Sequence, residues 1–317
     1  MLNFLYCFDS NYNIQTIVSI YSLLKSVSEK INIFIIHQSE ETPEFLPKKI
    51  LENENLNNIH IYKFNKSDLK FYNLIDAHVT EATFYRLFLL KYIPENIKNI
   101  IYLDGDVYCI SDPLEQIKKE FQRLKSSGLE AGFSVETNRN DINQTSFKRL
   151  KLRGDSYFNA GVMLMDVEKA RKNNFSKKVF DILSQIKEDA VFWDQDILNK
   201  YYDDEFLKIT ESLNYKVNYF EKNYTEILKQ NNISLVHYSG KFKPWHVRGV
   251  AHSSSFIFQD IFNEVYDKKY YISNSRKIIA IKDFFKILIN LKFEFIKSPF
   301  FFLIGIFRFL LNKNKNI

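Results

Sequence analysis

Short apolar runs alternate with longer segments of helical spacing through most of the chain. Seven runs rich in β-branched and aromatic residues predict strands, at residues 3–8, 31–37, 59–64, 99–104, 130–135, 161–166 and 233–238. Between them, apolar residues at spacings of three and four predict helices over residues 14–27, 82–92, 113–124, 167–186 and 193–202. This order predicts an α/β fold with a mostly parallel or mixed sheet, helices on both faces and ligands at the carboxyl ends of strands.

The segment from Arg276 to the C terminus has a different pattern, in which apolar and basic residues are mixed. Its longest uninterrupted apolar run, residues 299–307, is far shorter than the ~20 residues that span a bilayer. Ser298 and Pro299 suit the N-cap and first position of a helix, and nearby Lys and Arg residues suit anionic headgroups. We therefore predict a main domain at 1–252 and a helical, membrane-associating region at 253–317. The alternative is that the apolar side chains pack on the main domain or on a second subunit.

Charge and cysteine content narrow the class of protein. The chain has a formal net charge of +6, but residues 276–317 contain nine Lys or Arg and two Asp or Glu, so the rest has a net charge of −1. This distribution does not favour a nucleic-acid partner. Cys7 and Cys109 lie in separate apolar runs without metal-ligand spacing, which predicts neither disulfides nor zinc and suits a reducing cytoplasm. The N-terminal run lacks basic residues and soon reaches Asp9, so we expect no signal peptide.

Two aspartates, Asp104 and Asp106, follow an apolar run in "YLDGDV" (102–107). Neither GxGxxG nor GxxxxGK[ST] occurs in the chain, so another device must hold any phosphate group. In an extended segment, residues i and i+2 point to the same side, and adjacent carboxylates repel unless a cation lies between them. We therefore expect a divalent ion, manganese or magnesium, with coordination positions left for phosphate oxygens. A solvated turn is the alternative for so short a pattern.

A second polar group follows the last predicted strand, in "LVHYSGKFKPW" (235–245). The neutral imidazole of His237 can complete a metal's coordination, Gly240 allows backbone to approach a phosphate, and Lys243 can neutralise diphosphate charge. Taken singly, these residues have common structural explanations, a hydrogen-bonded histidine and a solvated lysine. Together with the aspartates they form part of an ordered set of motifs.

That set resembles the bacterial α-glycosyltransferases of glycosyltransferase family 8, and it consists of FDSNY (8–12), ATFYRLFL (82–89), YLDGDV (102–107), YFNAGVMLMDV (157–167), WDQDILN (193–199) and HYSGKFKPW (237–245). Members include lipopolysaccharide and lipo-oligosaccharide galactosyl- and glucosyltransferases and, more distantly, glycogenin. The resemblance runs from the first strand to about residue 250, and the basic aromatic segment after it is similar to the membrane-associating tails of bacterial members. It implies a GT-A-type, Rossmann-like mixed sheet flanked by helices, a UDP-sugar donor, a manganese cofactor with magnesium as the alternative, and transfer with retention of anomeric configuration.

The resemblance also implies roles for individual residues. The residues that resemble metal ligands are Asp104, Asp106 and His237. Those that resemble donor contacts are Gly240 and Lys243 at the diphosphate, Asp9 and Asn11 at uracil and ribose, Gly105 near the ribose, Arg86 at the sugar and phosphate region, and Asn159 and Ala160 at the donor sugar. Gly105 stands where relatives often carry a larger residue, which would loosen a ribose contact. For Asp9 and Asn11 the alternative is an Asx turn, and for Arg86 it is a surface salt bridge.

Two residues of "WDQDILN", Asp194 and Gln195, resemble the pair that holds sugar hydroxyls and lines the reaction face. Retention requires either a carboxylate nucleophile or same-face attack on an ion pair, and an amide is a poor nucleophile. We therefore favour same-face substitution with Gln195 as electrostatic support. If a covalent intermediate forms, Asp194 is the nearest carboxylate candidate.

The predicted function is transfer of a hexose, galactose or glucose, from a UDP-sugar to a glycan or glycolipid acceptor in the synthesis of lipopolysaccharide or capsule. We expect the enzyme to lie peripherally on the inner face of the cytoplasmic membrane. Residues 136–155 have no clear match in the family, and their polar, basic character suits either an anionic or sugar-rich acceptor or a solvated loop. The alternative function is a metal-dependent sugar-nucleotide phosphohydrolase or nucleotidyltransferase, which would use the same aspartate pair.

Overall fold

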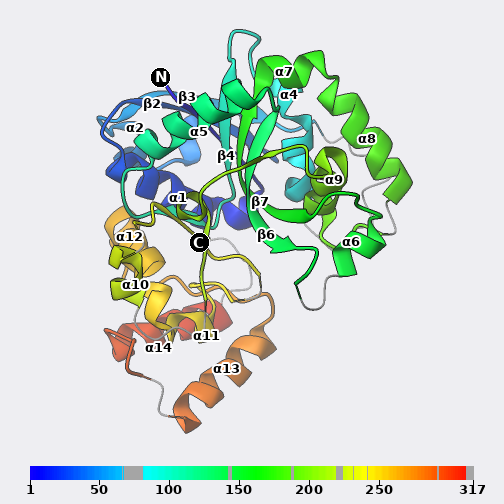
Figure 1. Ribbon diagram of the computed structural model, residues 1–317. Helices are drawn as coiled ribbons and strands as arrows, with labels where there is room; N and C mark the ends of the chain where they lie inside the picture. The colour runs from blue at the N-terminus through cyan, green and yellow to red at the C-terminus, as the bar shows by residue number, and fades with distance from the viewer. Residues whose placement is uncertain are drawn as a thin grey trace.

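The computed structural model describes residues 1–65, 67, 81–141, 145–186, 189–218, 224–230, 232–240, 242–290 and 293–311. In this part of the chain a large sheet lies between layers of helices (Figure 1). The last two helices, α13 (Lys277–Ile289) and α14 (Pro299–Leu311), lie at the end of the molecule away from that sheet (Figure 1). The predicted α/β class is confirmed.

The described strands form two sheets. The larger has the order β3-β2-β1-β4-β7-β6-β8, in which β1 is parallel to β2 and β4, and β7 is antiparallel to both of its neighbours. The smaller has the order β5-β10-β9. The strands are β1 Asn3–Phe8, β2 Ile31–His37, β3 Leu56–Lys63, β4 Asn99–Leu103, β5 Val107–Cys109, β6 Ala131–Asn138, β7 Ser156–Asp166, β8 Leu207–Lys208, β9 Tyr215–Lys216 and β10 Leu235–His237.

Helices of the described residues vary widely in length. The remaining α-helices are α1 Asn13–Ser26, α2 Lys48–Leu51, α4 Leu89–Tyr92, α5 Leu114–Ser127, α6 Thr145–Arg149, α7 Val167–Lys172, α8 Phe175–Ile186, α9 Trp193–Tyr202, α10 Tyr224–Gln230, α11 Val247–Val250 and α12 Phe256–Tyr266. Short 3-10 helices are η1 Ser10–Tyr12, η2 Pro43–Phe45, η3 Glu81–Phe88, η4 Glu211–Leu213 and η5 Ser253–Ser255. Local sequence sets the ends of α5, because Asp112 accepts the Leu114 N–H over 2.9 Å and Gly128 ends the helix at a φ of 66°.

Side chains alternate between the two faces of the large sheet and build a core on each. Along β1, Phe4 and Tyr6 belong to a core that also contains residues of α1 and α5. Leu5 and Cys7 belong to the other core, which contains residues of η3, α8 and α9. Because both faces are covered, the central strands are almost continuously apolar. Polar side chains are therefore concentrated where strands end.

The seven predicted strands are all present; those at 3–8 and 31–37 have the predicted ends, and the others differ at one or both ends by up to five residues. The helix predicted over 82–92 is instead η3 followed by α4, and the helix predicted over 167–186 is broken into α7 and α8. The break lies at Asn173 and Asn174, and Asn174 has a φ of 55°, a conformation that asparagine tolerates better than most residues. Strands β5, β8 and β9 were not predicted, because runs of two or three residues carry no periodicity.

The C-terminal helices have a small core of their own. In it, α13 and α14 pack with α11 through Val247, Val250, Ala280, Ile287, Phe302 and Ile306. In contrast, α12 packs against α1 and places Phe258 and Phe262 in a cluster with Tyr108 and Trp245. The division into a catalytic domain and a C-terminal region after residue 252 stays a prediction. Helix α12, which follows residue 252, packs against α1 of the main domain. No helix in the described part of the chain combines the length and apolar character that a bilayer crossing requires.

Candidate active site

The candidate site lies where strands of the two sheets meet. Asp104 directly follows β4, and Asp9 directly follows β1. Because β1 and β4 are parallel neighbours, both aspartates lie at the carboxyl edge of the large sheet. After Asp106 the chain enters β5, which pairs antiparallel with β10 so that His237 lies opposite Val107. The turn through residues 104–106 therefore joins the two sheets and brings His237 close to both aspartates.

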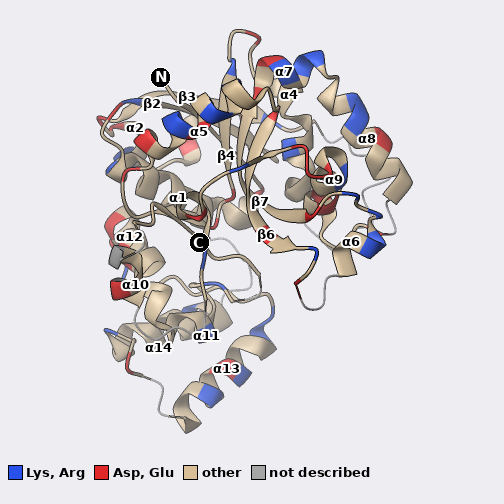
Figure 2. Cartoon of the chain, viewed as in Figure 1, with Lys and Arg blue, Asp and Glu red and all other residues tan. Residues whose placement is uncertain are grey.

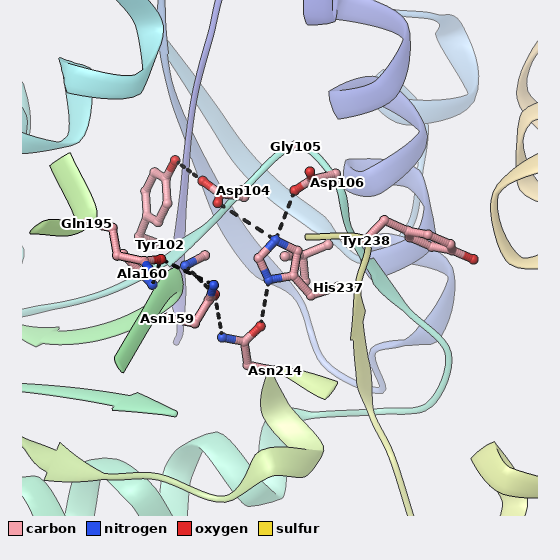
Figure 3. A network of polar contacts seen from close by, with 12 residues as sticks. Tyr102, Asp104, Gly105, Asp106, Asn159, Ala160, Gln195, Asn214, His237 and Tyr238 are labelled. Atoms are coloured by element: carbon pink, nitrogen blue, oxygen red, sulfur yellow. Dashed lines mark hydrogen bonds and ion pairs between the residues drawn. The ribbon is translucent and has the colours of Figure 1, made fainter. Parts of the chain in front are cut away.

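The three predicted metal ligands converge (Figure 3). One potential ligand atom from each of Asp104, Asp106 and His237 lies within 4.8 Å of the others. His237 Nε2 is 3.3 Å from Asp106 Oδ1 and 4.0 Å from Asp104 Oδ2. The expected extended geometry is wrong, because Val107 N–H donates to the Asp104 carbonyl over 3.1 Å and closes a turn. The pairing of β5 with β10, and not strand alternation, brings the carboxylates to His237.

This set of side chains fits a divalent cation. Two carboxylate oxygens and an imidazole nitrogen are ligands that Mn²⁺ accepts, and three protein ligands leave positions for oxygens of a bound substrate. Asp106 is buried and Asp104 is half-buried, so their negative charge requires a nearby positive partner. A cation between the two carboxylates would meet that requirement.

Lys243 provides positive charge beside Asp106. Its Nζ forms an ion pair with Asp106 Oδ2 and donates to the Tyr238 carbonyl over 2.6 Å. Burial alone would raise the pKa of Asp106, but the Lys243 ammonium beside it outweighs burial and holds that pKa below its usual range. Asp106 is therefore ionised at neutral pH, as a metal ligand must be.

Arg86 connects two of the predicted acidic residues. Its guanidinium donates to Asp104 Oδ1 over 2.7 Å and to the Ala160 carbonyl over 2.5 Å, and its Nε is 2.7 Å from Asp194 Oδ2. Because Arg86 is buried, the surface salt bridge considered for it is wrong. Burial raises the pKa of Asp194 to about 7 against the lowering effect of Arg86. The carboxyl group of Asp194 is therefore buried beside the guanidinium of Arg86.

The side chain of Gln195 makes four hydrogen bonds. Its Oε1 accepts from Asn159 Nδ2 over 3.2 Å and from Ala160 N–H over 3.1 Å. Its Nε2 donates to Glu136 Oε2 over 3.0 Å and to the Tyr157 hydroxyl over 3.2 Å. The predicted donor-sugar contacts Asn159 and Ala160 therefore meet the predicted catalytic residue (Figure 3). The Gln195 oxygen accepts from two protein donors, so its orientation is determined by the protein.

The remaining predicted donor contacts lie in local turns. Asp9 accepts the Asn11 N–H over 2.9 Å, so the Asx-type hydrogen bond considered as the alternative is present. Asp9 is buried and Asn11 is exposed. Gly240 has a φ of 82°, a left-handed conformation that favours glycine. The nucleotide and phosphate roles of these three residues stay predictions.

Gly105, between the two aspartates, is required by its neighbour α1. A Cβ at this position would lie 2.3 Å from Thr16 Oγ1 and 3.2 Å from Tyr12 Cδ1. Glycine at this position therefore has a packing reason. The looser ribose contact expected for Gly105 stays a prediction.

The segment over residues 136–155 is anchored at several points. Arg149 pairs with the buried Asp196 over 2.7 Å, and Arg139 donates to the Leu152 carbonyl over 2.9 Å. Residues 142–144 lie outside the described part of the chain. A wholly solvated loop is therefore wrong for the described residues of this segment, and an acceptor role stays a prediction.

Two polar residues of the site were missed by sequence reasoning. Asn214, just before β9, is buried, donates to Asn159 Oδ1 over 3.0 Å and lies 2.9 Å from His237 Nδ1. Glu136, on β6, accepts from Gln195 and pairs with Lys216. Neither belongs to a recognised motif, and a single buried asparagine carries no signal in one sequence.

The arrangement of the sheets matches that of a known enzyme. The galactosyltransferase LgtC, solved with donor and acceptor sugar analogues, superposes with a TM-score of 0.69 at 19% identity, covering 84% of this chain and 96% of that chain. The fold is thus of the GT-A type. The sequence pattern described as Glycosyl transferase family 8 matches residues 3–249, and the chain therefore belongs to that family and is a glycosyltransferase.

Relatives of this chain have related activities. A lipopolysaccharide 1,2-glucosyltransferase of Escherichia coli is 29% identical over 276 residues, which cover 80% of this chain and 76% of the relative. A lipopolysaccharide 1,3-galactosyltransferase of Salmonella typhimurium is 26% identical over 270 residues, which cover 81% and 77%. Family membership confirms the predicted enzyme class, with a sugar donor and a glycan acceptor, and gives no support to the phosphohydrolase or nucleotidyltransferase alternative.

Proposed function

We propose that this chain transfers a hexose, galactose or glucose, from a UDP-sugar to a glycan or glycolipid acceptor in cell-surface polysaccharide synthesis. The activities named for the two relatives support both the hexose and a lipopolysaccharide acceptor, with capsule as the other polysaccharide considered. The observation that carries the proposal is the convergence of Asp104, Asp106 and His237 with Lys243 beside them. A cation and a lysine at one place can together neutralise a diphosphate.

Mn²⁺ is the proposed metal, with Mg²⁺ as the alternative. An imidazole ligand favours Mn²⁺, because Mg²⁺ prefers oxygen ligands alone. Asp104, Asp106 and His237 would hold the ion, and Gly240 and Lys243 would contact the diphosphate. When bound, the ion acts as a Lewis acid that stabilises UDP as the leaving group.

The donor nucleotide and sugar are proposed to lie along the carboxyl edge of the large sheet. The residues proposed to bind them are Asp9 and Asn11 at uracil and ribose, Gly105 near the ribose, Arg86 at the sugar and phosphate region, and Asn159 and Ala160 at the sugar. Burial of Arg86 among Asp104, Asp194 and Ala160 supports a positioned cation near the reacting bond.

Same-face substitution is the proposed route to retention. The Gln195 oxygen already accepts two hydrogen bonds and Asp194 is paired with Arg86, so neither group is presented as an unengaged nucleophile. Gln195 would instead stabilise positive charge at the sugar with an oxygen whose direction is set by Asn159 and Ala160. Detection of a glycosyl adduct on Asp194 or Gln195 would overturn this route.

The C-terminal region, residues 253–317, is proposed to hold the catalytic domain, residues 1–252, on a membrane surface through α13 and α14. These helices expose Ile289, Phe300 and Phe307, and α13 carries basic residues among its apolar ones (Figure 2). We place the enzyme at the inner face of the cytoplasmic membrane. Anionic lipids there attract basic segments, and the buried, unpaired Cys7 and Cys109 suit a reducing compartment.

UDP release from a panel of UDP-sugars tests the proposed function. We expect release from one donor in the presence of Mn²⁺, and its loss on chelation. Asp106→Ala should lower release by roughly a hundredfold or more, because a Lewis-acid contribution of several kcal/mol corresponds to such a factor. Asp181→Ala, which changes an exposed aspartate on α8, is the control. Formation of sugar phosphate or nucleoside monophosphate in place of UDP would contradict the proposal and favour the hydrolytic alternative.

A further inference from the structure

Asn214 lies between two groups of the site and has no role in the proposed chemistry. It is buried between η4 and β9, and its side chain contacts Asn159 and His237 (Figure 3). Its backbone N–H donates to the Glu211 carbonyl over 2.9 Å, so the main chain that carries it is itself held. A buried amide with partners on both sides can set the proton positions of those partners.

The hydrogen bonds determine which way this amide is turned. Gly161 N–H can only donate, and it donates to Asn159 Oδ1 over 3.0 Å. The Asn214 atom 3.0 Å from that same oxygen must therefore belong to its NH₂ group. The Asn214 oxygen then faces His237 Nδ1 at 2.9 Å. Because a carbonyl oxygen only accepts, His237 Nδ1 carries the proton.

Proton placement at Nδ1 has a direct consequence for the other ring nitrogen. A neutral imidazole has one N–H, so Nε2 keeps its lone pair. Nε2 is the atom that faces Asp106 and Asp104 (Figure 3). The opposite tautomer would turn an N–H toward Asp106 and could not ligate a metal.

Close packing keeps the His237 ring in this position. A Cβ at Gly161 of β7 would lie 2.2 Å from His237 Cε1 and 2.7 Å from Nδ1, so the ring lies directly against the strand backbone. Asn214 therefore sets the proton of a ring whose position β7 and β10 already restrict.

We propose that Asn214 is a positioning residue that holds His237 in the Nδ1–H tautomer and links this metal ligand to Asn159. The proposal rests on the proposed function only for the identity of the metal. The tautomer itself follows from contacts within the protein. Through Asn159, the same hydrogen-bonded chain continues to Gln195 over 3.2 Å, so one network orients the metal ligand and the donor-sugar contacts.

Nitrogen NMR on protein labelled with ¹⁵N-histidine tests the tautomer without any substrate or metal. We expect an N–H signal type at Nδ1 of His237 in the wild-type protein, because the Asn214 oxygen faces that nitrogen. Loss of the signals in His237→Gln assigns them among the six histidines. In Asn214→Ala we expect a mixture of the two tautomers, because no acceptor faces Nδ1.

Titration of Mn²⁺, followed by electron paramagnetic resonance in the absence of donor, tests the consequence. We expect Asn214→Ala to weaken Mn²⁺ binding about ten- to a hundredfold, as loss of a partner that orients a metal-bound histidine does. Asn214→Asp keeps an acceptor for Nδ1–H but loses the N–H donor to Asn159 Oδ1, so it should restore the tautomer and only part of the affinity. Ser212→Ala, which removes a hydrogen bond to Gln116 from the same 3-10 turn, is the control and should change neither.

The outcomes separate this inference from the proposed function. An Asn214→Ala protein with the wild-type tautomer and wild-type Mn²⁺ affinity would overturn the inference. If Asn214→Ala does not fold, the tautomer in Asn214→Asp decides: an N–H at His237 Nδ1 supports the acceptor role, and loss of that N–H overturns it. Failure of the wild-type chain to bind Mn²⁺ at all would instead sink the proposed metal site while leaving the tautomer assignment standing.

Discussion

At the scale of single residues, Gly161 places the main chain of β7 directly against the His237 ring. It lies in β7 between Ala160 and Val162, and the His237 ring occupies the space that any larger side chain would need. The motif "YFNAGV" thus contains a glycine because of a residue far away in sequence. A larger side chain at residue 161 would therefore require the His237 ring or the backbone of β7 to move.

Substitution Gly161→Ala should therefore displace His237. We expect Mn²⁺ affinity to fall at least tenfold, and the free energy of unfolding to fall by about 1–3 kcal/mol, as for overpacked sites. Calorimetric titration with Mn²⁺ and urea unfolding measure the two effects. Gly132→Ala, whose Cβ would meet Ile209 Cγ2 at 2.9 Å, is a matched control that should lose stability but keep the metal. Unchanged Mn²⁺ binding in Gly161→Ala would contradict this account of the packing.

At the scale of elements, the end of β2 shows how one side chain can organise a turn. His37, the last residue of β2, is buried, and its Nδ1 accepts N–H groups of Ser39 over 3.1 Å and Glu40 over 2.8 Å. Nε2 must then carry the proton, which it donates to Asn13 Oδ1 at the start of α1 over 2.9 Å. Burial lowers the pKa of His37 from 6.5 to about 4.

Stability should consequently depend on pH through His37. Between its unfolded pKa of 6.5 and its folded pKa of about 4, the unfolded chain binds more protons, so acidification favours unfolding. The contribution is complete above the unfolded pKa and is lost as pH falls through the folded one. We expect a loss of roughly 3 kcal/mol between about pH 7 and pH 4, measured by urea unfolding. Between pH 7 and pH 4, the free energy of unfolding of His37→Gln should fall by roughly 3 kcal/mol less than that of the wild type. An equal dependence on pH in both proteins would refute the prediction.

At the scale of the whole molecule, the apolar surface is concentrated on α13 and α14. Phe302 and Ile306 of α14 face the small core with α11, whereas Phe300 and Phe307 are 69% and 61% exposed. On α13, Ile289 is 79% exposed. An apolar surface of this kind, next to basic residues and at one end of the molecule, is typical of contact with a lipid surface.

A double substitution, Ile289→Glu with Phe300→Glu, tests that contact in the full chain. We expect binding to vesicles that contain phosphatidylglycerol to fall by roughly a hundredfold, because burial of two large apolar side chains is worth several kcal/mol. Flotation with the vesicles measures binding, and UDP release in solution should stay unchanged. Leu51→Glu, on α2 of the main body, is the control for an added charge at an exposed leucine. Equal vesicle binding of the double variant would exclude these helices as the membrane contact.

The sequence predicted long apolar runs more accurately than short ones. The strands from Asn3 to Phe8 and from Ile31 to His37 were predicted at their observed ends, because both are largely apolar runs whose side chains are mostly buried. Residues 82–88 were predicted as α-helix, since the spacing of apolar residues separates α from 3-10 geometry poorly over so few turns. β5 and β9 have too few residues for any periodicity, although β5 carries the chain away from the metal site.

For the site, the sequence alone determined which residue types are available as metal ligands and their order along the chain. It predicted Asp104, Asp106 and His237 as ligands from motifs, because a motif needs only residue identity and the neighbouring strand pattern. Only the tertiary structure decided that the aspartates lie on a turn, that Arg86 is buried and that Asn214 faces His237. These facts depend on the pairing of β5 with β10 and on contacts between residues far apart in sequence, and local patterns carry no information about such contacts.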